Sequence, residues 1–404
     1  MKISFSRQEK ILLFILAAIQ FNHIVDFMIL MPLGPQLMRL FSITTTQFSW
    51  LVSSYTFCAG ISGFLASFIM DQYDRKKLLI FFFIGFCVGT LACALAPTYE
   101  LLLLSRALTG MFGGVLNSVV LSIVSDVIPY EKRGTAMGVI STAFSLASIA
   151  GVPFALFLAN LWGWHSSFLF LAFVSFLIFP MIILWIPNQA SHLGGLRVRK
   201  PVLDPLLHIF KTPGQLWALA FGGFLVLGQF MIIPFLSPSL VANAGLKESQ
   251  LPFIYLVGGT LTFITGPFVG RLSDQVGKHK VFKYGLISSI FVTLWITHLS
   301  VQSIYLTLTI VGLFFICVNA RWVPALALIS SVPSPEYRGS FMSFVGCIQQ
   351  LMAGLGAVIA GAIVTRGTDG LLHNYGWVGV VSVIVSFTAL MLSYLVIRER
   401  TQPN

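Results

Sequence analysis

The sequence predicts an all-α membrane protein with twelve transmembrane helices, and its composition and its apolar runs both support this. Of the 404 residues, 57% are hydrophobic and only 9% are charged, whereas soluble domains carry about 25% charged residues. The apolar runs at 11–38, 47–70 and 214–242 reach the roughly 20 residues that a helix needs to cross a bilayer. Strands of a membrane barrel would instead alternate over about ten residues. Because lipid accepts only helices and closed barrels, we expect the spans to be helices.

The basic residues concentrate in alternate loops between the expected spans. These spans cover residues 11–38, 47–70, 78–96, 100–126, 134–160, 165–186, 214–242, 250–270, 281–299, 302–330, 339–365 and 374–397. Most of the 24 Lys and Arg residues lie in the termini and in the loops after even-numbered spans, whereas the opposite loops hold only Arg39, Lys247 and Arg366. Since basic loops stay in the cytoplasm, we predict a multi-pass protein of the inner (plasma) membrane with both termini cytoplasmic. The net charge of +11 then reflects topology, and no nucleic-acid partner is expected.

The cysteines give no sign of a disulfide or a metal site. Cys58, Cys87, Cys93, Cys317 and Cys347 all lie inside apolar runs, and none forms a CxxC pair. Small buried hydrophobic side chains are the favoured interpretation of such cysteines. We therefore expect no disulfide, metal or cofactor.

The two halves of the chain repeat each other at an offset of about 203 residues. Asp71–Lys77 (DQYDRKK) matches Asp274–Lys280 (DQVGKHK), EKRG at 131–134 matches EYRG at 336–339, and Pro32 matches Pro234. Ordered matches of this kind indicate a duplicated unit. We predict a six-helix bundle over 1–186, a cytoplasmic linker over 187–213 and a second six-helix bundle over 214–404.

At these loops the sequence resembles the major facilitator superfamily, and within it the twelve-span drug:proton antiporters and their sugar-efflux relatives. The family's loop signature, Gly-x-x-x-Asp-Arg-x-Gly-Arg-Lys, is closely matched from Gly270 to Lys278. The first-half copy departs from it at Ser67, Gln72 and Asp74. At Asp74, which replaces the second glycine, we expect left-handed backbone, because Asp tolerates it better than most residues.

Two further motifs support the resemblance. Arg106-x-x-x-Gly110 in span 4 is similar to the family's buried-arginine motif, and Gly151-Val152-Pro153 in span 5 is similar to the Gly-Pro motif associated with antiporters. The resemblance implies a major facilitator fold, with Arg106 in conformational or proton coupling and with Gly151 and Pro153 in an antiport mechanism. Parallel repeats of this kind rock around a site near the midplane of the membrane.

The loop signature also predicts a gate on the cytoplasmic side. Asp71 and Asp274 are expected to lie against the positive N-terminal dipole of a neighbouring helix, and Arg75 is expected to pair with Asp126 at the end of span 4. The alternative is that the basic residues only fix the topology, which leaves the two aspartates unexplained. The further residues of the predicted gate are Lys278, Arg133 and Arg338.

Four ionisable residues lie deep inside the expected spans, where an Asp or Arg costs ~2.5–3.5 kcal/mol on insertion scales and is a functional candidate by default. Asp26 lies midway along span 1, and its spacing of three residues from His23 puts both on one face of a helix. We predict that Asp26, with His23 and Arg106, couples transport to protons; the alternative is a fixed structural ion pair. For Arg106 the alternative is extension to the membrane surface. Arg321 in span 10 is expected either to bind an anionic substrate group or to be the counter-ion of Asp26.

Neutral polar residues complete the predicted substrate cavity. They lie on spans 1, 2, 4, 7, 10 and 11, and each is alternatively a hydrogen bonder between helices. The candidates are Asn22, Tyr55, Asn117, Gln229, Asn319, Gln349 and Gln350.

Together these features predict a monomeric secondary transporter that exports a small organic compound (drug-like, a sugar or a metabolite) in exchange for protons by alternating access. Its partners would be the lipid bilayer, protons and a small-molecule substrate. The alternatives are proton-coupled uptake of a small nutrient or organic anion and, more remotely, a non-transporting sensor or a membrane-embedded enzyme. An enzyme would need a nucleophile–base or metal-ligand cluster, and the sequence has none, so no enzymatic activity is expected.

Overall fold

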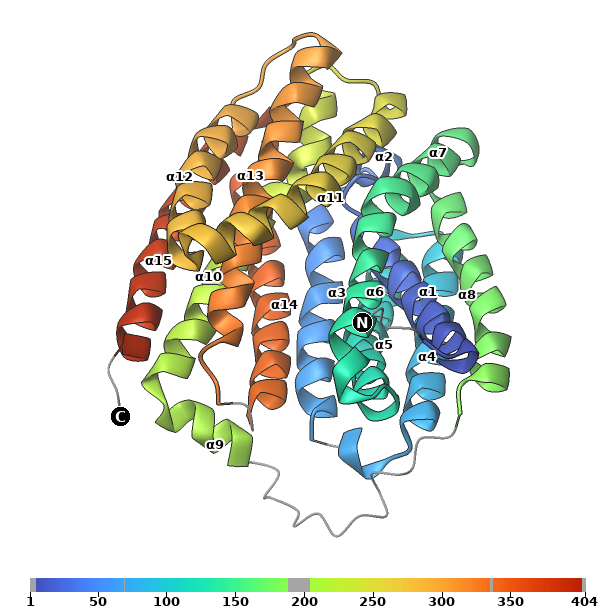
Figure 1. The fold of residues 1–404 in the computed structure, drawn as a ribbon. Coiled ribbons are helices and arrows are strands. Elements are labelled where there is room, and N and C mark those ends of the chain that lie inside the picture. Colours follow the sequence, from blue (N-terminus) through green and yellow to red (C-terminus); the bar gives the residue numbers. More distant parts are fainter. Residues whose placement is uncertain (1–4, 69, 188–203, 335–336, 402–404) are drawn as a thin grey trace. The chain divides into compact units, whose positions relative to one another are not determined.

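The chain folds into long apolar helices, as expected. The structure is a computed structural model and describes residues 5–68, 70–187, 204–334 and 337–401. Within these residues, twelve helices are long and apolar enough to cross a membrane, so the predicted all-α twelve-span fold is confirmed. Figure 1 shows these helices in chain order.

The first half of the chain contains six of the spans. Its spans are formed by α1 (Arg7–Ile29), α3 (Thr45–Ala66), α4 (Arg75–Leu95), α5 (Tyr99–Val127), the continuous helical stretch α6–η2–α7 and α8 (His165–Trp185). Two short helices, α2 (Gly34–Leu40) and the 3₁₀ turn η1 (Met70–Gln72), lie between spans. The fifth span is α6 (Tyr130–Leu146), the π-helical η2 (Ala147–Gly151) and α7 (Val152–Trp162).

The second half contains the other six spans and two features that the sequence did not predict. Its spans are formed by α10 (Pro213–Ala242), α11 (Leu251–Val276, preceded by the 3₁₀ turn η4, Glu248–Gln250), α12 (Lys278–Thr297), α13 (Ile304–Ser330), α14 (Arg338–Ile363) and α15 (Tyr375–Thr401). The additional elements are the short helix α9 (Asp204–Lys211) and a hairpin of β1 (Thr365–Arg366) and β2 (Leu372–His373), paired antiparallel.

The first span ends earlier than predicted. α1 stops at Ile29, and the chain re-enters a helix only at Gly34, so the prediction of a continuous helix over 11–38 is wrong. Pro32 removes a backbone donor and clashes with the carbonyl four residues earlier, which ends α1. Its counterpart in the repeat, Pro234, lies inside the uninterrupted α10.

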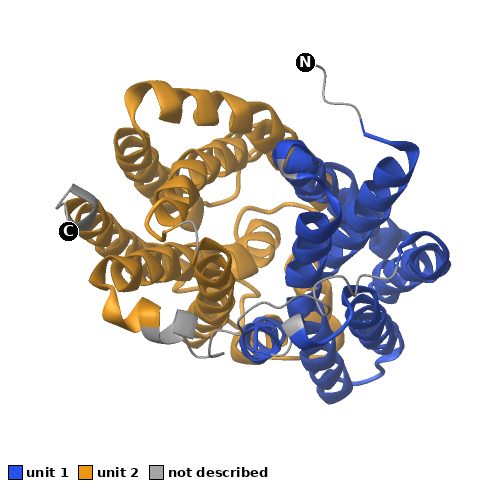
Figure 2. Ribbon diagram, turned by 60° about the horizontal axis from the view of Figure 1, so that its bottom comes forward, with its two compact units in different colours: residues 1–30, 54–199 blue, residues 31–53, 200–404 orange. Residues whose placement is uncertain are grey.

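The described structure contains two compact units, shown in Figure 2. The first comprises residues 1–30 and 54–199, and the second comprises 31–53 and 200–404. The predicted domain boundaries at 187 and 213 stay a prediction, because residues 188–203 lie outside the described residues.

Within the first unit, α4 packs between α5 and α8, while α1 packs against α6 and α8. A cluster of aliphatic and phenylalanine side chains forms the hydrophobic core of these helices. Within the second unit, α10 packs against α14 and α15, and α13 packs against α11 and α12. Many small hydroxyl side chains are also buried, but buried charged side chains such as Asp26, Arg106 and Arg321 are few, and each marks a candidate site.

Segment 31–53, which belongs to the first half by sequence, packs on helices of the second half. The Thr45 hydroxyl donates to the Val364 carbonyl at 2.6 Å, and the ring of Phe48 contacts that of Phe235. Arg39 donates from Nη1 and Nη2 to the two oxygens of the Glu248 carboxylate, and this hydrogen-bonded carboxylate raises the pKa of Arg39. Charged and hydroxyl contacts thus tie the segment after α1 to the second unit.

Candidate functional site

A buried ion pair joins α1 to α5 inside the first unit. Arg106 donates from Nη1 to Asp26 Oδ2 at 2.8 Å and to the Asp26 carbonyl at 3.3 Å, and the two side chains are 1% and 0% exposed. Thr90 of α4 donates its hydroxyl to Asp26 Oδ1 at 3.2 Å. Three helices therefore converge on one carboxylate. The interpretation that Arg106 extends to the membrane surface is wrong, because its guanidinium is turned inward onto Asp26.

Aromatic rings surround the ion pair. The Arg106 guanidinium carbon lies 4.4 Å from the centre of the Tyr55 ring and 6.0 Å from that of Phe168, distances at which a cation is attracted to the face of a ring. The rings of Tyr55 and Phe86 also contact His23. A site of this composition holds charge in a place from which water is largely excluded.

His23 and Tyr55 bring unsatisfied polar atoms close to the ion pair. In the described structure, neither ring nitrogen of His23 has a hydrogen-bond partner, and the Tyr55 hydroxyl has none either. Both groups face Gly113 of α5, where a Cβ atom would lie 2.7 Å from the Tyr55 hydroxyl and 3.2 Å from His23 Nε2. Buried polar groups are nearly always hydrogen-bonded in native proteins, so this pair of orphaned groups is exceptional, and its functional role stays a prediction.

Glycines set the close approach of the helices that build the site. A Cβ on Gly110 of α5 would lie 2.7 Å from the Tyr55 Cα, and a Cβ on Gly89 of α4 would lie 2.9 Å from the Thr109 backbone. Small residues of this kind let membrane helices come into backbone contact. The motif Arg106-x-x-x-Gly110 thus combines the charge with the glycine that brings α3 against α5.

The motif Gly151-Val152-Pro153 lies where the fifth span changes its winding. The π-helical turn η2 ends at Gly151 and α7 begins at Val152. A Cβ on Gly151 would lie 3.0 Å from the Phe21 ring and would also meet Val25, the neighbour of Asp26. The motif therefore contacts α1 at the level of the ion pair, and its role in antiport stays a prediction.

The predicted cavity residues of the first unit divide into two groups. Tyr55 belongs to the ion-pair cluster. Asn22 is fully buried and donates to the Ser175 hydroxyl of α8 at 2.6 Å, while Asn117 accepts a hydrogen bond from Gln20. Asn22 thus joins two helices of one unit. Its place in a substrate cavity stays a prediction.

The predicted cavity residues of the second unit are spread over three helices. Asn319 of α13 donates to the Thr262 carbonyl and the Thr265 hydroxyl of α11, both at 3.2 Å. Gln349 of α14 has a buried amide nitrogen without a partner. Gln229 and Gln350 are half-buried. Arg321 is 3% exposed and donates to the Ser289 hydroxyl of α12 at 3.3 Å; it is not the ion-pair partner of Asp26, which is Arg106.

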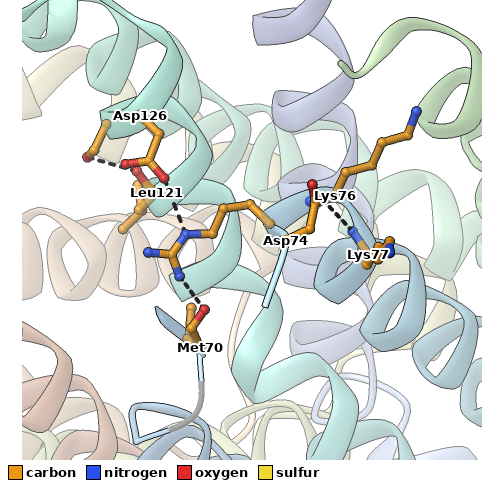
Figure 3. A network of polar contacts seen from close by, with 8 residues as sticks. Met70, Asp74, Lys76, Lys77, Leu121 and Asp126 are labelled. Atoms are coloured by element: carbon orange, nitrogen blue, oxygen red, sulfur yellow. Dashed lines mark hydrogen bonds and ion pairs between the residues drawn. The ribbon is translucent and has the colours of Figure 1, made fainter. Parts of the chain in front are cut away.

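A second polar network follows η1, as Figure 3 shows. Arg75 donates from Nε to Asp126 Oδ2 at 3.2 Å and from Nη1 to the Met70 carbonyl at 2.7 Å, so the predicted contact between Arg75 and Asp126 is confirmed. Asp74 caps α4 by accepting from the backbone nitrogens of Lys76 and Lys77 at 2.8 and 3.1 Å. The network ties the start of α4 to the end of α5.

The expectation of left-handed backbone at Asp74 is wrong. Its φ is −58°, and its carboxylate forms a helix cap in place of a glycine turn. The second copy of the loop has a glycine with positive φ at this position, since Gly277 adopts a φ of +105°. The two repeats therefore start α4 and α12 by different means.

The other predicted gate residues are less connected. The side chain of Asp71 lies outside the described part of the structure. Asp274 is exposed, and the ion pairs found among the described residues include none with Asp274, Lys278 or Arg338. Arg133 donates to the Ile128 carbonyl at 2.9 Å.

Sequence reasoning missed three residues of the first unit. Thr90 and Ser175 are hydroxyls in apolar helices and give no pattern by themselves. Gln20 does belong to a pattern, because Gln20, His23 and Asp26 follow each other at intervals of three residues and so lie along one face of α1.

The described residues thus contain twelve candidate membrane spans and, within the first unit, a buried carboxylate–guanidinium pair. The family model described as Major Facilitator Superfamily matches residues 16–357, and the chain belongs to this family, whose members are transporters rather than enzymes. The predicted family is confirmed.

The relatives agree with this assignment. The chain is 26% identical over 372 residues to the MFS-type transporter YwfA of Bacillus subtilis, covering 91% of this chain and 87% of that one. It is 25% identical over 414 residues to the lincomycin resistance protein LmrB of Listeria innocua, covering 87% and 86%. Among solved structures, a bacterial homologue of the human lysosomal transporter Spinster matches with a TM-score of 0.79 at 16% identity, over 99% of this chain and 100% of that one. The nucleoside transporter NupG matches with a TM-score of 0.73 at 12% identity, over 96% and 100%.

Proposed function

We propose that this protein is a proton-coupled secondary transporter that exports a small organic compound across the inner membrane, with both termini in the cytoplasm. The observation that carries the proposal is the ion pair of Asp26 and Arg106, buried among α1, α4 and α5. Export is favoured over uptake by the motif Gly151-Val152-Pro153 beside α1 and by the similarity to a protein named for lincomycin resistance.

Protonation of Asp26 changes the charge balance of the site. In the ionised pair, the carboxylate compensates the guanidinium, so the pair is neutral as a whole. A proton on Asp26 leaves the Arg106 charge uncompensated in an apolar interior, which is strongly unfavourable. The protein is then driven toward a conformation in which Arg106 reaches water or another acceptor. A proton bound on one side and released on the other thus becomes a switch between two conformations.

The available energy suffices for accumulation. One charge moved through a membrane potential of 100 mV supplies ~2.3 kcal/mol. This corresponds to a concentration ratio on the order of 50-fold for a neutral compound exchanged for one proton. The site therefore needs only one titrating carboxylate per cycle.

Asp26→Asn tests the proposal, because the amide keeps the shape of the side chain and removes its titration. In liposomes with an imposed pH gradient, wild-type protein is expected to drive uphill movement of at least one compound from a panel of lincomycin, a neutral sugar and an organic acid. In Asp26→Asn, the accumulation ratio is expected to fall to about 1, while exchange at equal concentrations persists. Asp26→Glu is the matched control and retains gradient-driven transport.

A fixed structural ion pair makes a different prediction for the same variants. Asp26→Asn would then lose exchange and uphill transport together, in proportion to the loss of folded protein. Uphill transport that persists in Asp26→Asn would show that the coupling carboxylate lies elsewhere.

The contact between Arg75 and Asp126 is proposed as part of a cytoplasmic gate, with Asp71, Asp274, Lys278, Arg133 and Arg338 as further members. We expect Arg75→Ala to raise the rate at which a cysteine introduced on the cytoplasmic side is labelled, because an ion pair that holds the closed state is lost. Lys77→Ala removes the same charge from the same first turn of α4 at an exposed position and is expected to leave labelling unchanged. Equal labelling of the two variants would assign the loop charges to topology alone.

A further inference from the structure

Arg321 is a buried cation that has no compensating charge among the residues that the structure describes. Its side chain is 3% exposed, and the ion pairs and ring–cation contacts of the described residues do not include it. Its only hydrogen bond there runs from Nη1 to the Ser289 hydroxyl at 3.3 Å. The buried Nε has no acceptor. The edge of the guanidinium formed by Nε and Nη2 is therefore unused.

The backbone around Arg321 is held from two sides. A Cβ on Gly285 of α12 would lie 2.8 Å from the Ala320 carbonyl carbon and 3.0 Å from the Arg321 nitrogen, so α12 and α13 are in backbone contact at this point. Asn319, two residues before Arg321, is hydrogen-bonded to α11. Contacts with both α11 and α12 thus hold this part of α13 in place.

Arg106 of the first unit shows which contacts stabilise a buried guanidinium in this protein. Arg106 has a carboxylate at 2.8 Å, a carbonyl at 3.3 Å and the face of a tyrosine ring. Arg321 is buried to a similar degree and has one neutral hydroxyl. An arginine stays charged in proteins, and an uncompensated buried charge is strongly unfavourable. Among the described residues of the second unit, Arg321 therefore lacks the anionic partner that would stabilise its charge.

We propose that Arg321 binds an oxyanion, a carboxylate or a phosphate group, through its free Nε and Nη2 edge. This edge presents two parallel N–H donors, which match the two oxygens of a carboxylate or phosphate. Ser289 holds Nη1 by accepting its hydrogen bond, since its own proton is donated to the Leu286 carbonyl at 2.7 Å. Ser289 is therefore a positioning residue that fixes the orientation of the unpaired edge of Arg321.

The oxyanion has two sources, a free ion or an anionic group on the transported compound. The second source rests on the proposed transport function and would give its substrate class as organic acids or phosphorylated compounds. The anion site itself rests only on the contacts of Arg321. Binding is therefore measured on purified full-length protein without a proton gradient, so that its outcome is independent of the Asp26→Asn transport experiment.

The experiment measures the thermal unfolding temperature in phosphate, acetate or benzoate against chloride at equal ionic strength, with benzamide as the neutral analogue of benzoate. At least one oxyanion is expected to raise the unfolding temperature by about 3 °C at one hundred times its dissociation constant, and benzamide is not. Arg321→Gln is expected to abolish the shift, and Ser289→Ala to weaken it. A shift with phosphate or acetate identifies a free ion as sufficient, whereas a shift with benzoate alone identifies a carboxylate on an organic compound.

Matched variants separate the site from general charge effects. Arg271→Gln removes an exposed arginine of α11, and Ser288→Ala removes an exposed hydroxyl adjacent to Ser289 on α12. Both are expected to keep the wild-type response. The proposal is overturned if no oxyanion stabilises the wild type relative to chloride, or if Arg321→Gln responds as the wild type does.

Discussion

Replacing Arg106 with Gln will destabilise the protein by about 3–5 kcal/mol, the usual effect of removing one member of a buried ion pair. Asp26 keeps its charge in this variant, but its partner at 2.8 Å is gone and only the Thr90 hydroxyl still donates to it. The double variant, in which Asp26 also becomes Asn, removes both charges and is expected to recover most of the lost stability. The measurement is the thermal unfolding of the purified wild-type, single and double variants.

The double variant separates stability from coupling. It is expected to fold and to exchange compounds at equal concentrations, yet to show no response to a pH gradient, because no titrating carboxylate remains in the site. Arg271→Gln, an exposed arginine on α11, controls for the loss of one positive charge and is expected to stay within about 0.5 kcal/mol of wild type. If the double variant were as unstable as Arg106→Gln, the cost would come from lost packing of the guanidinium against Tyr55 and not from an orphaned carboxylate.

The sequence predicted most of the fold because membrane insertion constrains composition directly. Long apolar runs are required wherever a helix crosses lipid, and most of the twelve spans found in the structure lie within a few residues of the predicted ones. The main disagreement is at the end of α1. Pro32 and Pro234 are equivalent in the repeat, yet only the first interrupts its helix, since a proline inside a membrane helix is tolerated where neighbouring groups satisfy the freed backbone.

The sequence predicted less of the candidate site because it gives the depth of a residue in a span but not its direction around the helix. Asp26 stood out as the one acid deep inside a span, but two arginines were possible partners. The contact with Arg106 depends on how the helices of the first unit pack, and glycines contribute to this because Gly89 brings α4 against α5 and Gly110 brings α3 against α5. Asp74 shows the same limitation, since its side chain replaced a glycine by capping α4 rather than by adopting the glycine conformation.

Gly110→Ala is expected to destabilise the protein by about 2–3 kcal/mol, near the upper end of what overpacking produces. The new Cβ would lie 2.7 Å from the Tyr55 Cα and 2.8 Å from its carbonyl carbon. Both are backbone atoms, so no side-chain rotation relieves the clash and α3 must move away from α5. Such a movement draws the Tyr55 ring away from Arg106, whose guanidinium carbon lies 4.4 Å from its centre. Thermal unfolding and proton-coupled transport are therefore expected to decline together.

Gly138→Ala is the matched control, and its effect on stability is expected to be opposite to that of Gly110→Ala. Gly138 lies in α6, and a Cβ there would meet nothing within 4 Å. Alanine in a helix interior is favoured over glycine by about 0.5–1 kcal/mol, so this variant gains stability and keeps its transport. Equal effects of the two substitutions would mean that α3 and α5 adjust to an extra methyl group without strain. The close helix approach at Gly110 would then not determine the position of Tyr55 over Arg106.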